Sequence, residues 1–153
     1  MVFDTRRGTR GARQPRGRWL VWLNRLVAGR VRRGGGKLGG SMDVLVLTTV
    51  GRRTGAERQT PVGWFPGDGD GWLVVASAAG AAGNPAWYYN LAAHPDKVQV
   101  EVHGRRVAVT AEQLHGAERE QAWAGIVAAA PRFGQYQQKT DRELPVIRLT
   151  PRD

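Results

Sequence analysis

Residues 44–65 read VLVLTTVGRRTGAERQTPVGWF, and this stretch decides the fold class. Its first seven residues are apolar or β-branched, which predicts a buried strand over 44–50. The glycines of the segment GRRTG then bound a turn that carries two arginines. Residues 59–65 predict a returning strand. Pro61 inside it requires a sheet edge or a bulge, because proline donates no hydrogen bond to a neighbouring strand.

The rest of the chain continues in short strands with two helical interruptions. Residues 66–71 predict a turn, and the Gly- and Ala-rich residues 77–83 predict a flexible loop. The first helix is predicted to have Asn84 as its N-cap and Pro85 at its first position. Further strands are predicted at 72–76, 98–102, 107–111 and 145–149, and helices at 85–93 and 116–130.

The order βββ-α-ββ-α-β is typical of a mainly β, α+β protein with a small antiparallel barrel. The sequence has no G-x-G-x-x-G motif, so nothing indicates a parallel dinucleotide-binding sheet. A chain of 153 residues with 41% hydrophobic residues suits one domain.

The composition excludes several classes of chemistry. The chain has no cysteine, which excludes disulfides, thiolate metal sites and cysteine nucleophiles. The three histidines lack the spacing of a ligand set, and no metal site is predicted. No apolar run approaches the roughly 20 residues of a membrane-spanning helix, and the N-terminus lacks the apolar stretch of a signal peptide. We therefore expect a cytoplasmic protein that, if it is an enzyme, relies on a bound cofactor.

The net charge of +10 is concentrated at the N-terminus. Residues 1–40 hold eleven of the 23 Lys and Arg residues but one of the 13 Asp and Glu residues, which leaves 12 of each sign in residues 41–153. A nucleic-acid-binding domain normally carries its own basic face. The neutral body therefore argues against nucleic acid as a partner.

The basic N-terminal part divides into two segments. Residues 1–17 are rich in Arg and Gly and are predicted to be a disordered tail. Residues 18–40 predict a basic amphipathic helix followed by a Gly linker, with the apolar residues of Trp19–Val27 at helical spacing. This helix either packs its tryptophans against the domain or lies on an anionic membrane surface. Residues 41–153 then form the folded domain.

Arg52, Arg53 and Arg58 concentrate positive charge at the turn between the first two strands. Turn arginines and a helix N-terminus together suit a phosphorylated, anionic ligand. The glycines of the 77–83 loop allow the backbone to approach such a ligand closely. The alternative is that the three arginines are ordinary solvated turn residues.

Aromatic side chains occur in two later stretches. Trp87, Tyr88 and Tyr89 are adjacent on the predicted helix, so they cannot all face one side, and they either belong to the core or border a ring pocket. Phe133 and Tyr136 are three residues apart, which places them on one helical face. They too are either core residues or the wall of a pocket, where the Tyr136 hydroxyl is able to donate a proton.

These segments, in this order and spacing, resemble the deazaflavin-dependent nitroreductase family over residues 43–150. The segments that carry the resemblance are LTTVGRRTG at 47–55, Arg58, Pro61, VAS at 75–77, NPAWY at 84–88, YQ at 136–137 and KTDR at 139–142. The resemblance implies a split β-barrel related to flavin-mononucleotide-binding barrels. It also implies binding of coenzyme F-420, an actinobacterial and archaeal deazaflavin whose phosphate and oligoglutamate tail are anionic.

By position, the resemblance assigns the phosphate and tail to Arg53 and Arg58, with Arg52 nearby. Around the deazaflavin it places Pro61, Val75, Ala76, Ser77, Ala78, Asn84, Pro85, Ala86 and Trp87. The substrate side is assigned to Phe133, Tyr136 and Trp87, with Tyr136 as the catalytic residue. Many members have a lysine where Ala78 stands, and its absence removes one charge from the phosphate site. Phe133 likewise replaces a tyrosine.

The implied activity is hydride transfer from reduced F-420 to a quinone (menaquinone, for example), an enone or a nitroaromatic compound. Close relatives are associated with membranes, so the implied location includes the inner face of the cell membrane, reached through the Trp19–Val27 helix. The alternatives are a non-catalytic barrel that binds the deazaflavin or a lipid, and a flavin-mononucleotide oxidoreductase on the same barrel.

Overall fold

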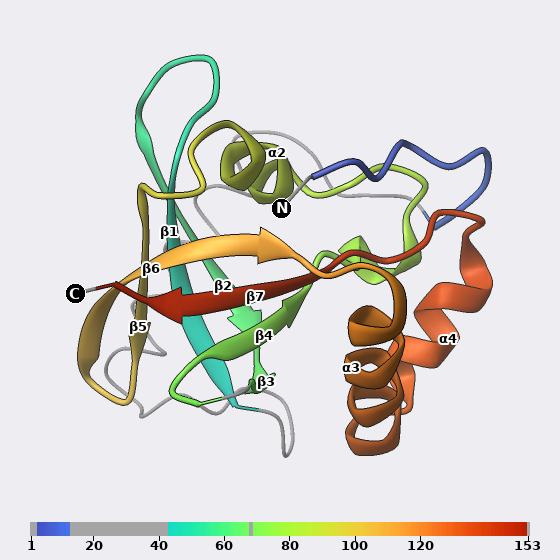
Figure 1. Ribbon diagram of the computed structural model, residues 1–153. Coiled ribbons are helices and arrows are strands. Elements are labelled where there is room, and N and C mark those ends of the chain that lie inside the picture. Colours follow the sequence, from blue (N-terminus) through green and yellow to red (C-terminus); the bar gives the residue numbers. More distant parts are fainter. Residues whose placement is uncertain (1–2, 13–42, 68, 153) are drawn as a thin grey trace.

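One seven-stranded antiparallel sheet forms the body of the protein (Figure 1). The structure is a computed structural model that describes residues 3–12, 43–67 and 69–152. The strands follow the order β2-β1-β5-β6-β7-β4-β3. They are β1 (Val44–Val50), β2 (Glu57–Gly63), β3 (Phe65–Pro66), β4 (Trp72–Val75), β5 (Val98–Val102), β6 (Arg105–Gln113) and β7 (Val146–Pro151).

The sheet curls because its two edge strands are consecutive in the chain. β2 and β3 stand at opposite ends of the strand order, yet Trp64 alone separates them. One residue spans at most about 3.6 Å, so the two ends of the sheet must meet. β2 pairs with β1 along its whole length, and Pro61 lies on this edge strand as predicted. The predicted fold class, a mainly β split barrel with helices, is confirmed.

Two hydrophobic clusters fill the fold. The barrel core joins the sheet to α2 (Ala86–Ala93), and the helix-side core joins β3, β4 and β7 to α3 (Gly116–Ala129) and α4 (Arg132–Lys139). The buried members of the barrel core are Leu45, Leu47, Val74, Ala76, Trp87, Tyr88, Leu91, Val98, Val100, Val102, Val109, Ala111, Ile147 and Leu149. Those of the helix-side core are Phe65, Leu73, Val75, Leu114, Ile126, Phe133, Leu144 and Val146.

The helices lie at different ends of the sheet. α2 covers the end near the β1–β2 turn, whereas α3 and α4 lie side by side beyond β4 and β7 (Figure 1). α3 begins where the sequence predicts and ends one residue earlier. α4 and the short 3-10 helix η1 (Ala78–Gly80) were not predicted as separate elements. α4 brings Phe133 and Tyr136 to one face, as their spacing predicts.

Residues 3–12 lie as an extended segment across the domain, so the prediction of a disordered tail is wrong for them (Figure 1). The N–H groups of Gly8 and Ala12 donate to the carbonyl oxygens of Ala82 and Gly80, at 2.8 and 3.0 Å. The composition misleads here because backbone hydrogen bonds, more than apolar burial, hold the segment. The amphipathic helix and Gly linker predicted for 18–40 lie outside the described residues.

Candidate functional site

The turn between β1 and β2 presents the predicted arginines at one end of the barrel (Figure 1). The Gly55 N–H donates to the Gly51 carbonyl at 2.9 Å, and Gly55 has a φ of 73°, which glycine adopts readily. Arg52, Arg53 and Arg58 are all exposed. Within the described part of the chain, none of the three guanidinium groups forms an ion pair with a carboxylate. Three positive charges are therefore available to an external anion.

A buried polar contact ties this turn to α2. Asn90 is 8% exposed; its Oδ1 accepts from the Arg52 backbone N–H at 3.1 Å, and its Nδ2 donates to Thr49 Oγ1 at 3.2 Å. The Arg52 guanidinium lies 4.6 Å from the ring centroid of Tyr89, a cation–π arrangement. Arg58 is the register partner of Thr49, and paired residues point to the same face of a sheet. Arg52 and Arg58 therefore both lie on the side of the sheet that α2 covers.

A buried arginine holds the loop that follows β4, residues 76–84. Arg142 is 2% exposed and donates to the carbonyl oxygens of Ala76, Ser77 and Ala81, at 2.9, 2.8 and 3.2 Å. It also donates to Oδ1 of Asn84 at 2.7 Å. Burial lowers the pKa of Arg142 from its usual value. The four oxygen acceptors compensate for removing the guanidinium charge from water.

The backbone of the 76–84 loop is strained next to these contacts. Ala78 and Ala79 have φ values of 47° and 54°, in the left-handed region that residues other than glycine rarely adopt, and Gly80 follows at 83°. The peptide groups before and after Ser77 both direct their carbonyls toward Arg142. Their N–H groups therefore point away from it, because the C=O and N–H of a trans peptide are antiparallel.

Asn84 does not cap α2, which corrects the prediction from the sequence. The N-cap position belongs to Pro85, and no side-chain cap is present there. The Asn84 Nδ2 donates to the carbonyl of Thr5 at 2.9 Å and to the hydroxyl of Tyr89 at 3.3 Å, while Oδ1 accepts from Arg142. Tertiary partners have replaced the local cap, and Asn84 joins the 76–84 loop to the N-terminal residues.

The aromatic residues assigned to the pockets divide between the two cores. Trp87, 8% exposed, belongs to the barrel core, and Phe133, 6% exposed, belongs to the helix-side core. Tyr136 is half-buried and meets Phe133 edge to face at 5.5 Å. The Tyr136 hydroxyl forms no hydrogen bond with any described residue, whereas the hydroxyls of Tyr88 and Tyr89 are hydrogen-bonded. Tyr136 is thus the one tyrosine whose hydroxyl is available to a ligand.

Helix α4 packs directly on the 76–84 loop. A Cβ atom at Gly80 would lie 2.6 Å from the carbonyl oxygen of Tyr136, so only glycine permits this approach. The contact brings the stretch assigned to the substrate against the loop assigned to the cofactor. Trp87 and Phe133, in contrast, are not brought into one cluster.

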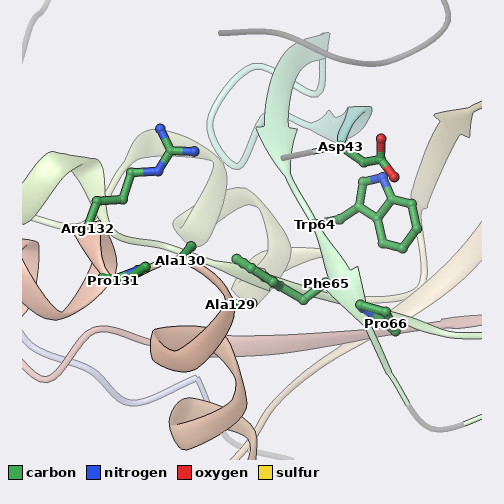
Figure 2. A pocket seen from close by; sticks show the side chains of 8 residues that line it. All are labelled: Asp43, Trp64, Phe65, Pro66, Ala129, Ala130, Pro131 and Arg132. Atoms are coloured by element: carbon green, nitrogen blue, oxygen red, sulfur yellow. The ribbon is translucent and has the colours of Figure 1, made fainter. Parts of the chain in front are cut away.

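A pocket of about 380 Å³ lies between residues 64–66 and the region where α3 meets α4 (Figure 2). Trp64 and the two residues of β3 line one side, and residues 129–132, from the end of α3 to the start of α4, line another. The Phe65 ring packs edge to face with Phe133 at 5.6 Å, and Phe133 in turn contacts Tyr136. The indole Nε1 of Trp64 is buried without a hydrogen-bond partner among the described residues.

A protein-family model described as "F420H(2)-dependent quinone reductase" matches residues 22–151. The chain belongs to this family. The quinone reductase Rv1261c of Mycobacterium tuberculosis is 37% identical over 147 residues, which cover 88% of this chain and 97% of that protein. A solved structure described as an F420-H2 dependent reductase, FDR-A, is 34% identical with a TM-score of 0.63, and covers 72% of this chain and 99% of that one.

Membership of the quinone reductase family confirms the resemblance, the split-barrel fold and the use of reduced F-420 as cofactor. The chain is accordingly an oxidoreductase. Of the acceptor classes expected from the sequence, the family description names the quinone.

Two residues of the candidate site received no role from the sequence. Arg142 was noticed only as part of the KTDR segment, and no pattern showed that it is buried against a loop some 60 residues earlier. Asn90 joins the arginine turn to α2 through contacts that no local pattern indicates. A buried polar side chain of this kind is recognised by its partners, which lie far away in the sequence.

Proposed function

We propose that this chain transfers a hydride from reduced F-420 to a quinone and binds the anionic tail of the cofactor on its arginine turn. The arginine turn carries the proposal, because its three exposed guanidinium groups form no ion pair within the described residues and Arg52 ties the turn to α2. A phosphate and an oligoglutamate tail are ligands that such charges bind well. The residues present therefore fit the cofactor of the family.

Arg53 and Arg58 would hold the phosphate and tail, while Arg52, whose guanidinium already lies over an aromatic ring, orients the turn. The N–H groups of Ser77 and Ala78 supply further donors on the loop side. Neutral amides attract an anion less strongly than the ammonium group of a lysine at position 78 would. The arginine turn therefore carries a larger share of anion binding here than in relatives with that lysine.

The backbone beside Val75 and Ala76 would flank the ring, because both side chains are buried in the cores. Pro61, half-buried on the edge strand, would form the facing contact. When bound, the reduced deazaflavin supplies the hydride. The protein contributes position, since it holds ring and acceptor in contact and keeps water away from both.

The pocket of Figure 2 is the proposed acceptor site. Its volume is within the range of small-molecule sites, and Phe65, Pro66 and Ala130 give it an apolar wall that suits the ring of a quinone such as menaquinone. The unpartnered Trp64 N–H at its edge is a donor for a quinone oxygen after a small movement of the side chain. Tyr136 does not line this pocket but lies at the other end of the Phe65–Phe133 contacts, so it would donate the proton to an acceptor that extends from the pocket to its hydroxyl.

The proposal is tested by titrating the full-length protein with oxidised F-420 and with flavin mononucleotide, followed by a turnover assay. We expect saturable binding of F-420, weaker binding of flavin mononucleotide, and reoxidation of reduced F-420 that depends on an added menaquinone analogue. Binding without quinone-dependent reoxidation would identify a non-catalytic barrel. Preferential binding of flavin mononucleotide would contradict the cofactor assignment.

Tyr136→Phe is expected to lower kcat about 100-fold, the lower end of general acid catalysis, because the acceptor loses its proton donor. The dissociation constant of oxidised F-420 and the melting temperature should stay unchanged, because the hydroxyl bonds no described residue. Stopped-flow reoxidation and cofactor titration measure the two quantities. An unchanged kcat would assign the proton to solvent, and a parallel loss of cofactor affinity would contradict the catalytic role.

We further propose peripheral binding to an anionic membrane through the predicted Trp19–Val27 helix, which lies outside the described residues. None of the helices in the described part of the chain is long and apolar enough to cross a membrane. Interfacial tryptophans and arginines support binding at the surface of such a membrane. Full-length protein should sediment with vesicles containing anionic lipid, and the double substitution Trp19→Ser, Trp22→Ser should lower the sedimented fraction. Equal sedimentation of the two proteins would refute this proposal.

A further inference from the structure

The N-terminal strap, residues 3–12, runs along the 76–84 loop (Figure 1). Three hydrogen bonds join the two segments, and each engages a different part of the loop. They are Ala12 N–H to Gly80 O at 3.0 Å, Gly8 N–H to Ala82 O at 2.8 Å, and Asn84 Nδ2 to Thr5 O at 2.9 Å. The strap therefore contacts the second half of the loop, residues 80–84.

The approach of the two backbones is so close that it requires glycine. A Cβ atom at Gly11 would lie 2.3 Å from the backbone nitrogen of Ala82 and 2.6 Å from the carbonyl carbon of Ala81. A Cβ atom at Gly8 would lie 2.4 Å from Oδ1 of Asp141. The glycines that made this segment look disordered are thus the residues that let it dock.

Asp141 fastens the strap from the other side. Its Oδ1 accepts from the N–H groups of Thr9 and Arg10, at 2.8 and 3.3 Å, and its Oδ2 accepts from the Thr9 hydroxyl. The hydrogen bonds from Thr9 lower the pKa of Asp141 to about 2. The next residue, Arg142, holds the same loop from beneath. Two consecutive side chains therefore hold the strap and the loop together.

We infer that the N-terminal strap is a positioning element of the cofactor site, which keeps the 76–84 loop in its cofactor-binding conformation. Ala78 and Ala79 have left-handed backbone conformations that persist only where surrounding contacts over-determine them. Arg142 binds the carbonyls of Ala76, Ser77 and Ala81, and the strap binds those of Gly80 and Ala82. This inference rests on the proposed function, in which the loop faces the cofactor.

The test compares Gly11→Ala with Gly125→Ala in the full chain. Gly125 lies on α3, and a Cβ atom there meets nothing within 4 Å, so it is a matched control. We expect Gly11→Ala to raise the dissociation constant of oxidised F-420 about tenfold, because apparent affinity falls with the fraction of molecules in the binding conformation. At saturating cofactor, the kcat of Gly11→Ala should differ from that of the wild type by less than about twofold, because the cofactor-bound loop has the same structure in the two proteins.

A second pair of variants avoids any steric clash. Thr9→Val removes the hydroxyl that donates a hydrogen bond to Asp141, while Thr9→Ser retains it. Thr9→Val should raise the same dissociation constant and speed amide hydrogen exchange in the 76–84 loop, and Thr9→Ser should restore both. The inference is overturned if wild-type protein binds F-420 and both Gly11→Ala and Thr9→Val bind it equally well. Failure of the wild type to bind F-420 would instead reject the proposed function.

Discussion

Arg142→Met is expected to lower the free energy of unfolding by about 3 kcal/mol. Losses of this size are typical when one partner of a buried, charge-assisted hydrogen bond is removed. Methionine fills a similar volume, but it leaves the carbonyls of Ala76, Ser77 and Ala81 without the donor they have in the native protein. A domain of ordinary stability, about 5–15 kcal/mol, should still fold, so the change is measurable by urea denaturation. The same variant should bind F-420 weakly, because the 76–84 loop loses its support.

The matched control for this prediction is Arg105→Met. Arg105 is an exposed arginine of β6 that makes no ion pair with a described residue, so its replacement should change the free energy of unfolding by less than about 0.5 kcal/mol. If the two variants unfold at the same urea concentration as the wild type, the hydrogen bonds of Arg142 do not carry the stability assigned to them.

Replacing both Arg53 and Arg58 with alanine is expected to raise the dissociation constant of F-420 about 100-fold or more, since each charge-assisted hydrogen bond contributes about 1.5–3 kcal/mol. Both side chains are exposed and not engaged by described carboxylates, so the free energy of unfolding should be nearly unchanged. The loss should grow with the number of glutamates in the cofactor tail and shrink at high salt. Fluorescence titration with F-420 of defined tail lengths measures both trends.

Arg105→Ala is the control for the charge itself. Arg105 follows the β5–β6 turn, which lies at the opposite end of β1 from the arginine turn, because β5 pairs with β1 in antiparallel register. This variant removes one of the two positive charges that the double variant removes, but at a distant site, and it should bind F-420 like the wild type. A loss independent of tail length in the double variant would show that the two arginines bind another part of the cofactor.

Local patterns predicted the sheet well, for reasons visible in β1 and β2. The apolar run over 44–50 matches β1 residue for residue, and the Gly-bounded turn and the edge position of Pro61 follow from backbone chemistry alone. The η1 and α4 elements were missed because short helices have little periodicity, and residues 59–65 were read as one strand although the sheet divides at Trp64.

In the candidate site, too, features that depend on local motifs were predicted and features that depend on distant partners were not. The family resemblance rested on short motifs, so the cofactor and the arginine turn were predicted before any contact was known. The roles of Asn84, Asn90 and Arg142 were not, because each depends on a partner distant in the chain. Asn84, for example, had every local feature of a helix cap, yet its oxygen accepts from Arg142, 58 residues later.

By itself, the sequence determined the class of fold, the cationic turn and the family. The strands and the turn follow from the backbone preferences of neighbouring residues, and the family is recognised from short motifs. Only the tertiary structure decided how the N-terminal strap and the 76–84 loop fit together. Thr9 and Asp141 are 132 residues apart, and their hydrogen bonds exist because the folded sheet brings both ends of the chain to one loop. A composition rich in Arg and Gly favours disorder in isolation, but a docking surface that hydrogen-bonds several backbone groups of the segment reverses that preference.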